Sequence, residues 1–297
     1  MKRFIALILP VLAVAAVWFV SRPVALTATA LPDHQPDPVN GKTMFYAGGC
    51  GSCHASPDIE AEPPLMGGGL ELETAFGIFT VPNISPHPVN GIGTWSMLDF
   101  VNAMHLGVSP DRRHYYPSFP YTSYQRLSFE DLMELKSYLD TLPVSDSQPA
   151  GHQLGFPWNL RDGIGLWKLV NLDPSFIIPV EDDNEELKRG RYLVDGPGHC
   201  GECHTPRDWT GGVATDRWLA GADNPDGEGR IPNISPSDKG LADWTASDIE
   251  YYLSSGFTPD FDTVGGSMVE VQENMTHLTA EDRAAIAAYL KAIPSQD

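Results

Sequence analysis

The chain has 297 residues, which is enough for two domains of ordinary size. Its 39 acidic residues outnumber 19 basic ones, so the formal net charge is −20, and no basic stripe with interleaved aromatic residues occurs. This composition makes nucleic acid an unexpected partner, and the acidity serves either docking to a partner with a basic face or solubility alone. The 26 prolines and 28 glycines predict short helices joined by much irregular chain.

An uncharged apolar run of 17 residues, from Phe4 to Val20, follows two basic residues near the N-terminus. A secretory h-region usually has ~7–15 residues, and a membrane-spanning helix needs roughly 17–25. We therefore expect residues 1–22 to be an uncleaved membrane anchor, with a tether over residues 23–37. A signal peptide cleaved at Ala28-Thr29-Ala30 is the alternative. Both interpretations export the rest of the chain.

The four cysteines form two pairs, each followed directly by a histidine: Cys50-Gly51-Ser52-Cys53-His54 and Cys200-Gly201-Glu202-Cys203-His204. C-x-x-C-H is the attachment pattern of c-type haem. Two thiols one helical turn apart can add to the two porphyrin vinyl groups, and the histidine then ligates the iron. A zinc site needs no histidine after each pair, and a redox dithiol usually lies in a βαβ context. We expect two covalently attached haem c groups.

The second motif lies 150 residues after the first, and other motifs repeat at nearly the same interval. Pro82-Asn83-Ile84-Ser85-Pro86 recurs at 232–236, and Trp95 corresponds to Trp244. Capping-box-like helix starts occur in both halves, at Ser96, Ser128, Thr245 and Thr279. No segment alternates apolar and polar residues for long. The sequence predicts an all-α fold, with two tandem domains of the class I cytochrome c type after the N-terminal anchor or signal segment.

The predicted domains cover residues 38–143 and 184–297, joined by an inter-domain segment over residues 144–183. This segment is too aromatic for a free linker, with Phe156, Trp158, Trp167 and Phe176. Its aromatic side chains either pack across both domains or form a docking surface for a partner or the membrane.

The sixth iron ligand differs between the halves. Met268, in Gly265-Gly266-Ser267-Met268-Val269, is the candidate for the second iron, because the loop precedes the last helix and small residues let the backbone approach the haem. Met275 competes but lies closer to that helix. The position equivalent to Met268 in the first half is Phe119, which cannot ligate iron.

Three alternatives stay open for the first iron. Met104 could reach it, although its spacing also fits an ordinary helix core, with His105 and His114 as weaker candidates. The iron could instead be five-coordinate, or Phe119 could cap a pocket for small ligands.

Other residues could support the haem groups. Pro57 and Pro206 follow the two haem histidines closely, and such loops commonly present a carbonyl to the histidine Nδ1–H. Trp95 and Trp244 could donate to propionates or serve as core aromatics.

The paired C-x-x-C-H motifs, the Pro-Asn-Ile-Ser-Pro loops, His114-Tyr115-Tyr116-Pro117 and Gly265-Gly266-Ser267-Met268 resemble those of a known family. They are similar to the cytochrome c subunits of bacterial membrane-bound alcohol, gluconate and sorbitol dehydrogenases, over roughly residues 38–297. Those subunits often carry three haem domains, and many have methionine where this chain has Phe119. The resemblance implies a protein on the periplasmic side of the bacterial cytoplasmic membrane. It also implies electrons arriving from a dehydrogenase and leaving to quinone, another cytochrome or an oxidase.

The sequence therefore favours a carrier of single electrons over an enzyme. A dihaem peroxidase is an alternative, with the Phe119 half as the reactive haem and His105, His114 or Glu130 as acid–base groups. A haem-based sensor of small ligands is another.

Overall fold

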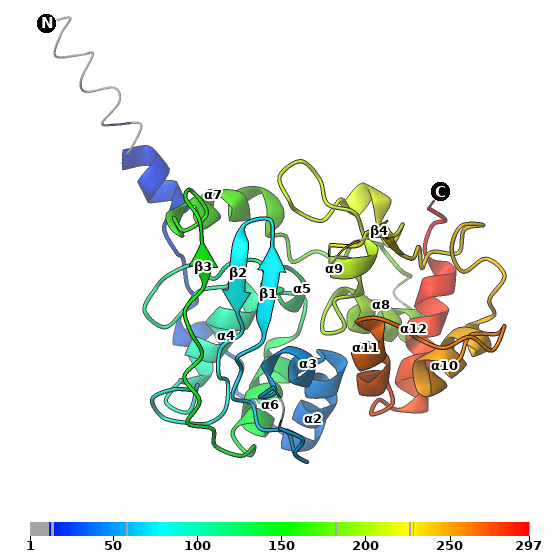
Figure 1. The fold of residues 1–297 in the computed structure, drawn as a ribbon, viewed down its shortest axis with the longest axis horizontal. Helices are drawn as coiled ribbons and strands as arrows, with labels where there is room; N and C mark the ends of the chain where they lie inside the picture. The colour runs from blue at the N-terminus through cyan, green and yellow to red at the C-terminus, as the bar shows by residue number, and fades with distance from the viewer. Residues whose placement is uncertain are drawn as a thin grey trace, which may run out of the picture.

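A computed structural model gives the fold and describes residues 12, 15–57, 59–181, 183–225, 227 and 229–296. Helices build both halves of the chain, which lie side by side (Figure 1). The helices of the first half are α2 (Pro38–Ala47), α3 (Cys50–His54), α4 (Met97–Leu106), α5 (Tyr121–Tyr124) and α6 (Phe129–Leu139). Those that follow are α7 (Asp162–Asn171), α8 (Glu185–Asp195), α9 (Cys200–His204), α10 (Ala246–Ser255), α11 (Met268–Met275) and α12 (Ala280–Ala292). Short 3-10 turns are η1 (Ala28–Ala30) and η2 (Thr215–Arg217).

One helix crossing recurs in each half and organises its core: α2 packs on α6, and α8 packs on α12. Gly41 and Gly190 lie at these crossings. A Cβ atom on Gly41 would lie 2.0 Å from the carbonyl oxygen of Glu134, and one on Gly190 would lie 1.9 Å from that of Ala285. Only glycine permits such a close approach. Our sequence analysis missed both residues, although their interval of 149 residues follows the repeat.

The predicted helix starts are confirmed. Ser96 and Asp99 form a reciprocal capping box at α4, and Thr245 and Asp248 form the same box at α10. The caps at Ser128 and Thr279 accept a backbone N–H from the third residue of α6 and α12.

The expectation of an all-α fold holds for the packed core and has to be corrected at two places. Strands β1 (Glu71–Thr74), β2 (Gly77–Thr80) and β3 (Gln153–Leu154) form an antiparallel sheet in the order β1-β2-β3. A second antiparallel pair joins β4 (Ala222–Asp223) and β5 (Arg230–Ile231). Strands of two to four residues are too short to produce a recognisable alternation, and backbone hydrogen bonds define them instead.

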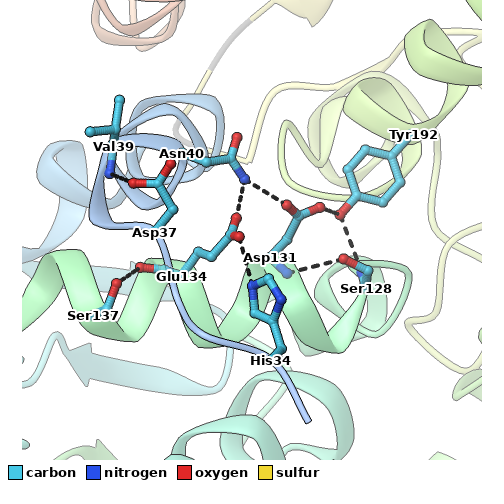
Figure 2. A network of polar contacts seen from close by, with 9 residues as sticks. All are labelled: His34, Asp37, Val39, Asn40, Ser128, Asp131, Glu134, Ser137 and Tyr192. Atoms are coloured by element: carbon cyan, nitrogen blue, oxygen red, sulfur yellow. Dashed lines mark hydrogen bonds and ion pairs between the residues drawn. The ribbon is translucent and has the colours of Figure 1, made fainter. Parts of the chain in front are cut away.

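A polar network joins the tether, the first half and the second half (Figure 2). Asn40 on α2 donates to both Asp131 and Glu134 on α6, and His34 of the tether contacts Glu134 at 2.8 Å. Tyr192 on α8 donates its hydroxyl to Asp131. Carboxylates of α6 therefore hold three otherwise separate parts of the chain together.

The segment between the halves packs against both of them. Lys168 on α7 donates to the carbonyl of Leu106 in the first half, at 2.7 Å, and Trp167 donates to Thr210 in the second half, at 3.1 Å. Phe156 and Trp158, by contrast, remain exposed. Helix α7 of the segment thus connects the two halves, whereas residues 156–158 of the segment face solvent.

The expected anchor falls largely on residues 1–11, 13 and 14, which lie outside the described residues. Residues 15–21 are helical, and Ser21 is buried against the body of the protein. None of the helices in the described part of the chain has the length and apolar character to cross a bilayer.

Candidate functional site

Helices α3 and α9 present the two C-x-x-C-H motifs in the same way. Each is a five-residue helix that places its two cysteines one turn apart and its histidine at the last position. The residues before the helices, Gly49 and His199, have φ angles of 56° and 37°. This left-handed conformation turns the chain sharply into each helix, which glycine tolerates and histidine adopts at a cost.

Both haem histidines are oriented by a backbone carbonyl. The Nδ1 of His54 lies 2.9 Å from the carbonyl oxygen of Pro82, and that of His204 lies 2.8 Å from that of Pro232. With Nδ1–H donating, Nε2 keeps the lone pair that an iron ligand requires. The acceptors are the first residues of the Pro-Asn-Ile-Ser-Pro loops. The expectation that the loops at Pro57 and Pro206 supply this carbonyl is therefore wrong, because chain folding brings a residue 28 positions further on to the ring.

The asparagines of these loops have a structural role that sequence reasoning missed. Asn83 Oδ1 accepts from the backbone N–H of Ser85, and Asn83 Nδ2 donates to the carbonyl of Ser145, at 2.9 Å. Asn233 accepts from Ser235 and donates to Gln296 in the same arrangement. Each loop is thus fastened to the chain just after the last helix of its half. The repeated Pro-Asn-Ile motif was the available signal.

The protonation of the site suits haem better than a redox dithiol. Burial lowers the pKa of both His54 and His204, which favours the neutral rings that a metal binds. Burial raises the pKa of Cys50 and of Cys200 to about 12, whereas a reactive dithiol needs a lowered thiol pKa. Among the described residues, no group of three His, Cys, Asp or Glu side chains converges as a metal site, so a shared zinc centre is not assembled.

The predicted ligand Met268 of the second half lies at the start of a helix, after an exposed glycine pair. Met268 is the first residue of α11 and is partly exposed. Gly265 and Gly266, just before it, have no atom within 4 Å of a built Cβ position. The competitor Met275 is buried in the hydrophobic core. The chemistry of the donor set of this half, with two thiols, one imidazole and the predicted thioether of Met268, suits haem.

The distal side of the first half is aromatic. Phe119 packs edge-on against Tyr115 and Tyr124, with ring centroids 5.7 and 5.8 Å apart. Met104, the first alternative for this iron, is buried in the core cluster.

The two alternative histidines contact other parts of the chain, and the Nδ1 atom of each is buried without a hydrogen-bond partner. His114 Nε2 lies 2.7 Å from the carbonyl oxygen of Ser21, and His105 packs against Phe129. Glu130 is exposed in the first turn of α6. Among the described residues, no hydrogen bond or ion pair joins His105, His114 and Glu130.

The two motif helices face the opposite half through reciprocal contacts. Ser123 on α5 donates to Glu202 of the second motif at 3.1 Å, and Asn274 on α11 donates to Ser52 of the first at 2.9 Å. Ser52 corresponds to Glu202 in the repeat, and Ser123 corresponds to Asn274, so the halves meet with approximate two-fold symmetry. Cys203 also contributes to raising the pKa of Cys53, after burial and Glu270. Both attachment helices therefore lie at the boundary between the two halves.

The fold and the paired motif helices define a c-type cytochrome. A family model described as cytochrome c matches residues 38–143. The chain is 50% identical over 290 residues to a diheme c-type cytochrome of Cereibacter sphaeroides, with 97% of each chain covered.

More distant relatives are dehydrogenase subunits. The chain is 32% identical to the fructose dehydrogenase cytochrome subunit of Gluconobacter japonicus, over 89% of this chain and 54% of the subunit. It is 31% identical to the gluconate 2-dehydrogenase cytochrome c subunit of Pantoea cypripedii, over 92% and 64%. The chain thus spans little more than half the length of these subunits.

The chain belongs to the dihaem c-type cytochrome family. Its cofactor is accordingly haem c, in two covalently attached copies.

Proposed function

We propose that the chain carries single electrons on the periplasmic face of the bacterial cytoplasmic membrane, from a dehydrogenase to a quinone, another cytochrome or an oxidase. The two histidines with Nδ1 engaged by proline carbonyls carry this proposal, since each stands at the end of a two-cysteine helix with Nε2 free to bind iron. The dehydrogenase subunits among the relatives support the donor. The apolar run from Phe4 to Val20 supports attachment to the membrane.

The protein's residues would hold each haem by two thioethers and one imidazole. Cys50, Cys53 and His54 serve the first haem; Cys200, Cys203 and His204 serve the second, with Met268 as its distal ligand. When bound, each haem supplies a one-electron iron couple whose potential depends on axial ligand, burial and hydrogen bonding. We assign these ligands to two tandem domains, at residues 38–143 and 184–297.

The fixed side chains are suited to a carrier. A hydrogen bond to a backbone carbonyl fixes the orientation of each imidazole ring, and a fixed ring would limit reorganisation when the iron changes charge. An acidic surface, with a formal net charge of −20, would speed the encounter with a basic partner at low salt.

The test begins with the haem-loaded full chain, captured from detergent-solubilised membranes of its own bacterium. We expect a dehydrogenase to copurify and its substrate to reduce both haems in a stopped-flow experiment. Reduced protein mixed with peroxide should reoxidise no faster than an ordinary monohaem cytochrome. Rapid peroxide turnover would contradict the carrier function. Haems that dithionite reduces but that the dehydrogenase and its substrate do not reduce would contradict it as well.

A further inference from the structure

Seven exposed apolar side chains gather at one end of the first half. We call them the α7 face: Phe76, Phe156, Trp158, Leu160, Leu166, Leu169 and Val170. The rings of Phe76 and Trp158 are in contact, with centroids 4.8 Å apart, which joins the turn between β1 and β2 to the 156–160 segment. Figure 1 places α7, β3 and this turn at the same end of the molecule. Phe156 is 80% exposed and Val170 is 71% exposed, so none of the residues that the structure describes covers this end.

The α7 face is poor in charge on a strongly acidic protein. Between residues 155 and 172 the charged residues are Arg161, Asp162 and Lys168. Arg161 donates to the carbonyl of His114, and Lys168 is buried beneath the end of α4. Both basic groups therefore turn inward, and Asp162 and, beside the Phe76 turn, Glu73 are exposed charges on a surface that is otherwise mainly apolar. Such a surface is costly in water and suited to an apolar environment.

The apolar N-terminal run leaves the body directly beside α7. A Cβ atom on Gly165 of α7 would lie 1.8 Å from the carbonyl oxygen of Ser21, so the two backbones touch. The helical residues 15–21 expose Val17, Trp18, Phe19 and Val20. The guanidinium of Arg22 lies 4.1 Å from the ring centre of Phe19, at the boundary between this apolar stretch and the folded domain. The exposed face and the anchoring segment are thus continuous.

We propose that the α7 face rests in the interfacial region of the lipid bilayer. The inference builds on the membrane attachment proposed above. Interfacial elements insert Trp, Phe and Leu side chains among lipid headgroups. Arg22, at the end of the apolar stretch, is placed to contact lipid phosphate groups. The anchor brings this face to the membrane surface, and the face then fixes the tilt of the first half. The cytochrome would accordingly present its haem-bearing halves in a defined orientation.

The experiment uses the full haem-loaded chain, reconstituted in vesicles of phosphatidylcholine with some phosphatidylglycerol. After haem attachment the native cysteines are thioethers, so a single introduced cysteine can carry a nitroxide label. The variants are Phe156→Cys and Leu169→Cys on the α7 face. Val89→Cys is the matched control, because Val89 is apolar and 82% exposed but lies outside this face. The readout is the accessibility of each label to dissolved oxygen and to a water-soluble nickel complex.

We expect the labels at 156 and 169 to lose nickel accessibility several-fold on reconstitution and to gain oxygen accessibility, while the label at 89 stays in water. If the chain floats with the vesicles but the label at 169 behaves like that at 89, the inference is overturned and the anchor survives. If the chain does not float at all, both fail. Shielding that occurs only in native membranes, and not in vesicles, would show a protein partner instead of lipid and would also overturn it.

Discussion

The two halves orient the proximal histidine in the same way and differ at the position expected on the distal side of the haem. Both orient the haem histidine with the carbonyl of a Pro-Asn-Ile loop, and both cross their first and last helices at a glycine. On the distal side, Met268 of the second half has Phe119 as its counterpart. Haem attachment and the helix crossing tolerate little variation, because they depend on covalent geometry and backbone contact. The distal position tolerates much more, and it is a principal determinant of the potential of the iron.

The halves also differ in the side chain that donates to the last turn of the equivalent helices α4 and α10. The carbonyl at the end of α4 accepts from Lys168, whereas that of Leu253 on α10 accepts from Gln272, at 3.2 Å. Of these two helices, α4 accepts from a lysine on α7 of the inter-domain segment, and α10 accepts from a neutral amide on α11. The five changes below test the comparison.

Removing the thiols of one half should cost that half its haem and leave the other loaded. We expect Cys200→Ala/Cys203→Ala to retain one covalent haem and Cys50→Ala/Cys53→Ala to retain the other. Intact-protein mass spectrometry after maturation in the native export pathway checks this. Two haems remaining in either variant would contradict the assignment of these cysteines.

Changing the distal residues should reveal the difference between the irons. Met268→Ala should abolish the charge-transfer band of methionine-ligated haem and lower one of the two potentials, because methionine ligation raises the potential. Phe119→Ala should leave that band intact, and Phe119→Met should add a second one. Visible spectra and redox titrations measure both effects; a band that survives in Met268→Ala would identify another ligand.

Adding one methyl group at a helix crossing should destabilise either half. Gly190→Ala and Gly41→Ala place a Cβ within 2.0 Å of a carbonyl oxygen, so the helices must separate, at about 1–3 kcal/mol or more. Gly163→Ala is the control, since this glycine of α7 has open space around its Cβ position. Urea unfolding of the haem-loaded protein should show the loss for the first two variants alone.

Breaking the ion pair between Arg189 on α8 and Asp282 on α12 should lower the free energy of unfolding more than breaking the equivalent contact between Asn40 on α2 and Asp131 on α6. Arg189 binds Asp282 through two hydrogen bonds of 2.7 and 3.0 Å, and Arg189→Ala leaves this buried carboxylate unpaired, at about 1–3 kcal/mol. Asn40→Ala should cost about 0.5–1.5 kcal/mol, because Asp131 keeps the hydroxyl of Tyr192. Lys188→Ala breaks an exposed pair and should cost less than about 0.5 kcal/mol. Equal losses in all three would contradict this ranking.

The buried lysine that caps α4 should make the stability of the first half rise with pH in the alkaline range. Burial lowers the pKa of Lys168 to about 7, while the unfolded chain keeps a value near ~10.4. Between these values the unfolded state binds a proton that the folded state does not, so the free energy of unfolding rises with pH, by at most about 1.4 kcal/mol per unit. Lys168→Met should remove this slope. Denaturant titrations at several pH values measure it, and parallel profiles for both proteins would refute it.

The sequence by itself determined everything that depends on local spacing. Two cysteines and a histidine within five residues define an attachment helix wherever they fold, and the capping boxes fixed the starts of α4 and α10 because their bonds span three residues. The repeat of about 150 residues showed that the two halves are built alike.

Only the tertiary structure decided what depends on contacts between distant segments. It selected Pro82 and Pro232 as histidine acceptors instead of the nearby prolines, and it buried Met104 in the core. Pairing of very short strands and the meeting of α5 with the opposite motif helix leave no periodic trace in the sequence. The physical reason is the same in each case: these partners are chosen by packing in three dimensions, and residues close in space there lie between 28 and more than 200 positions apart in the chain.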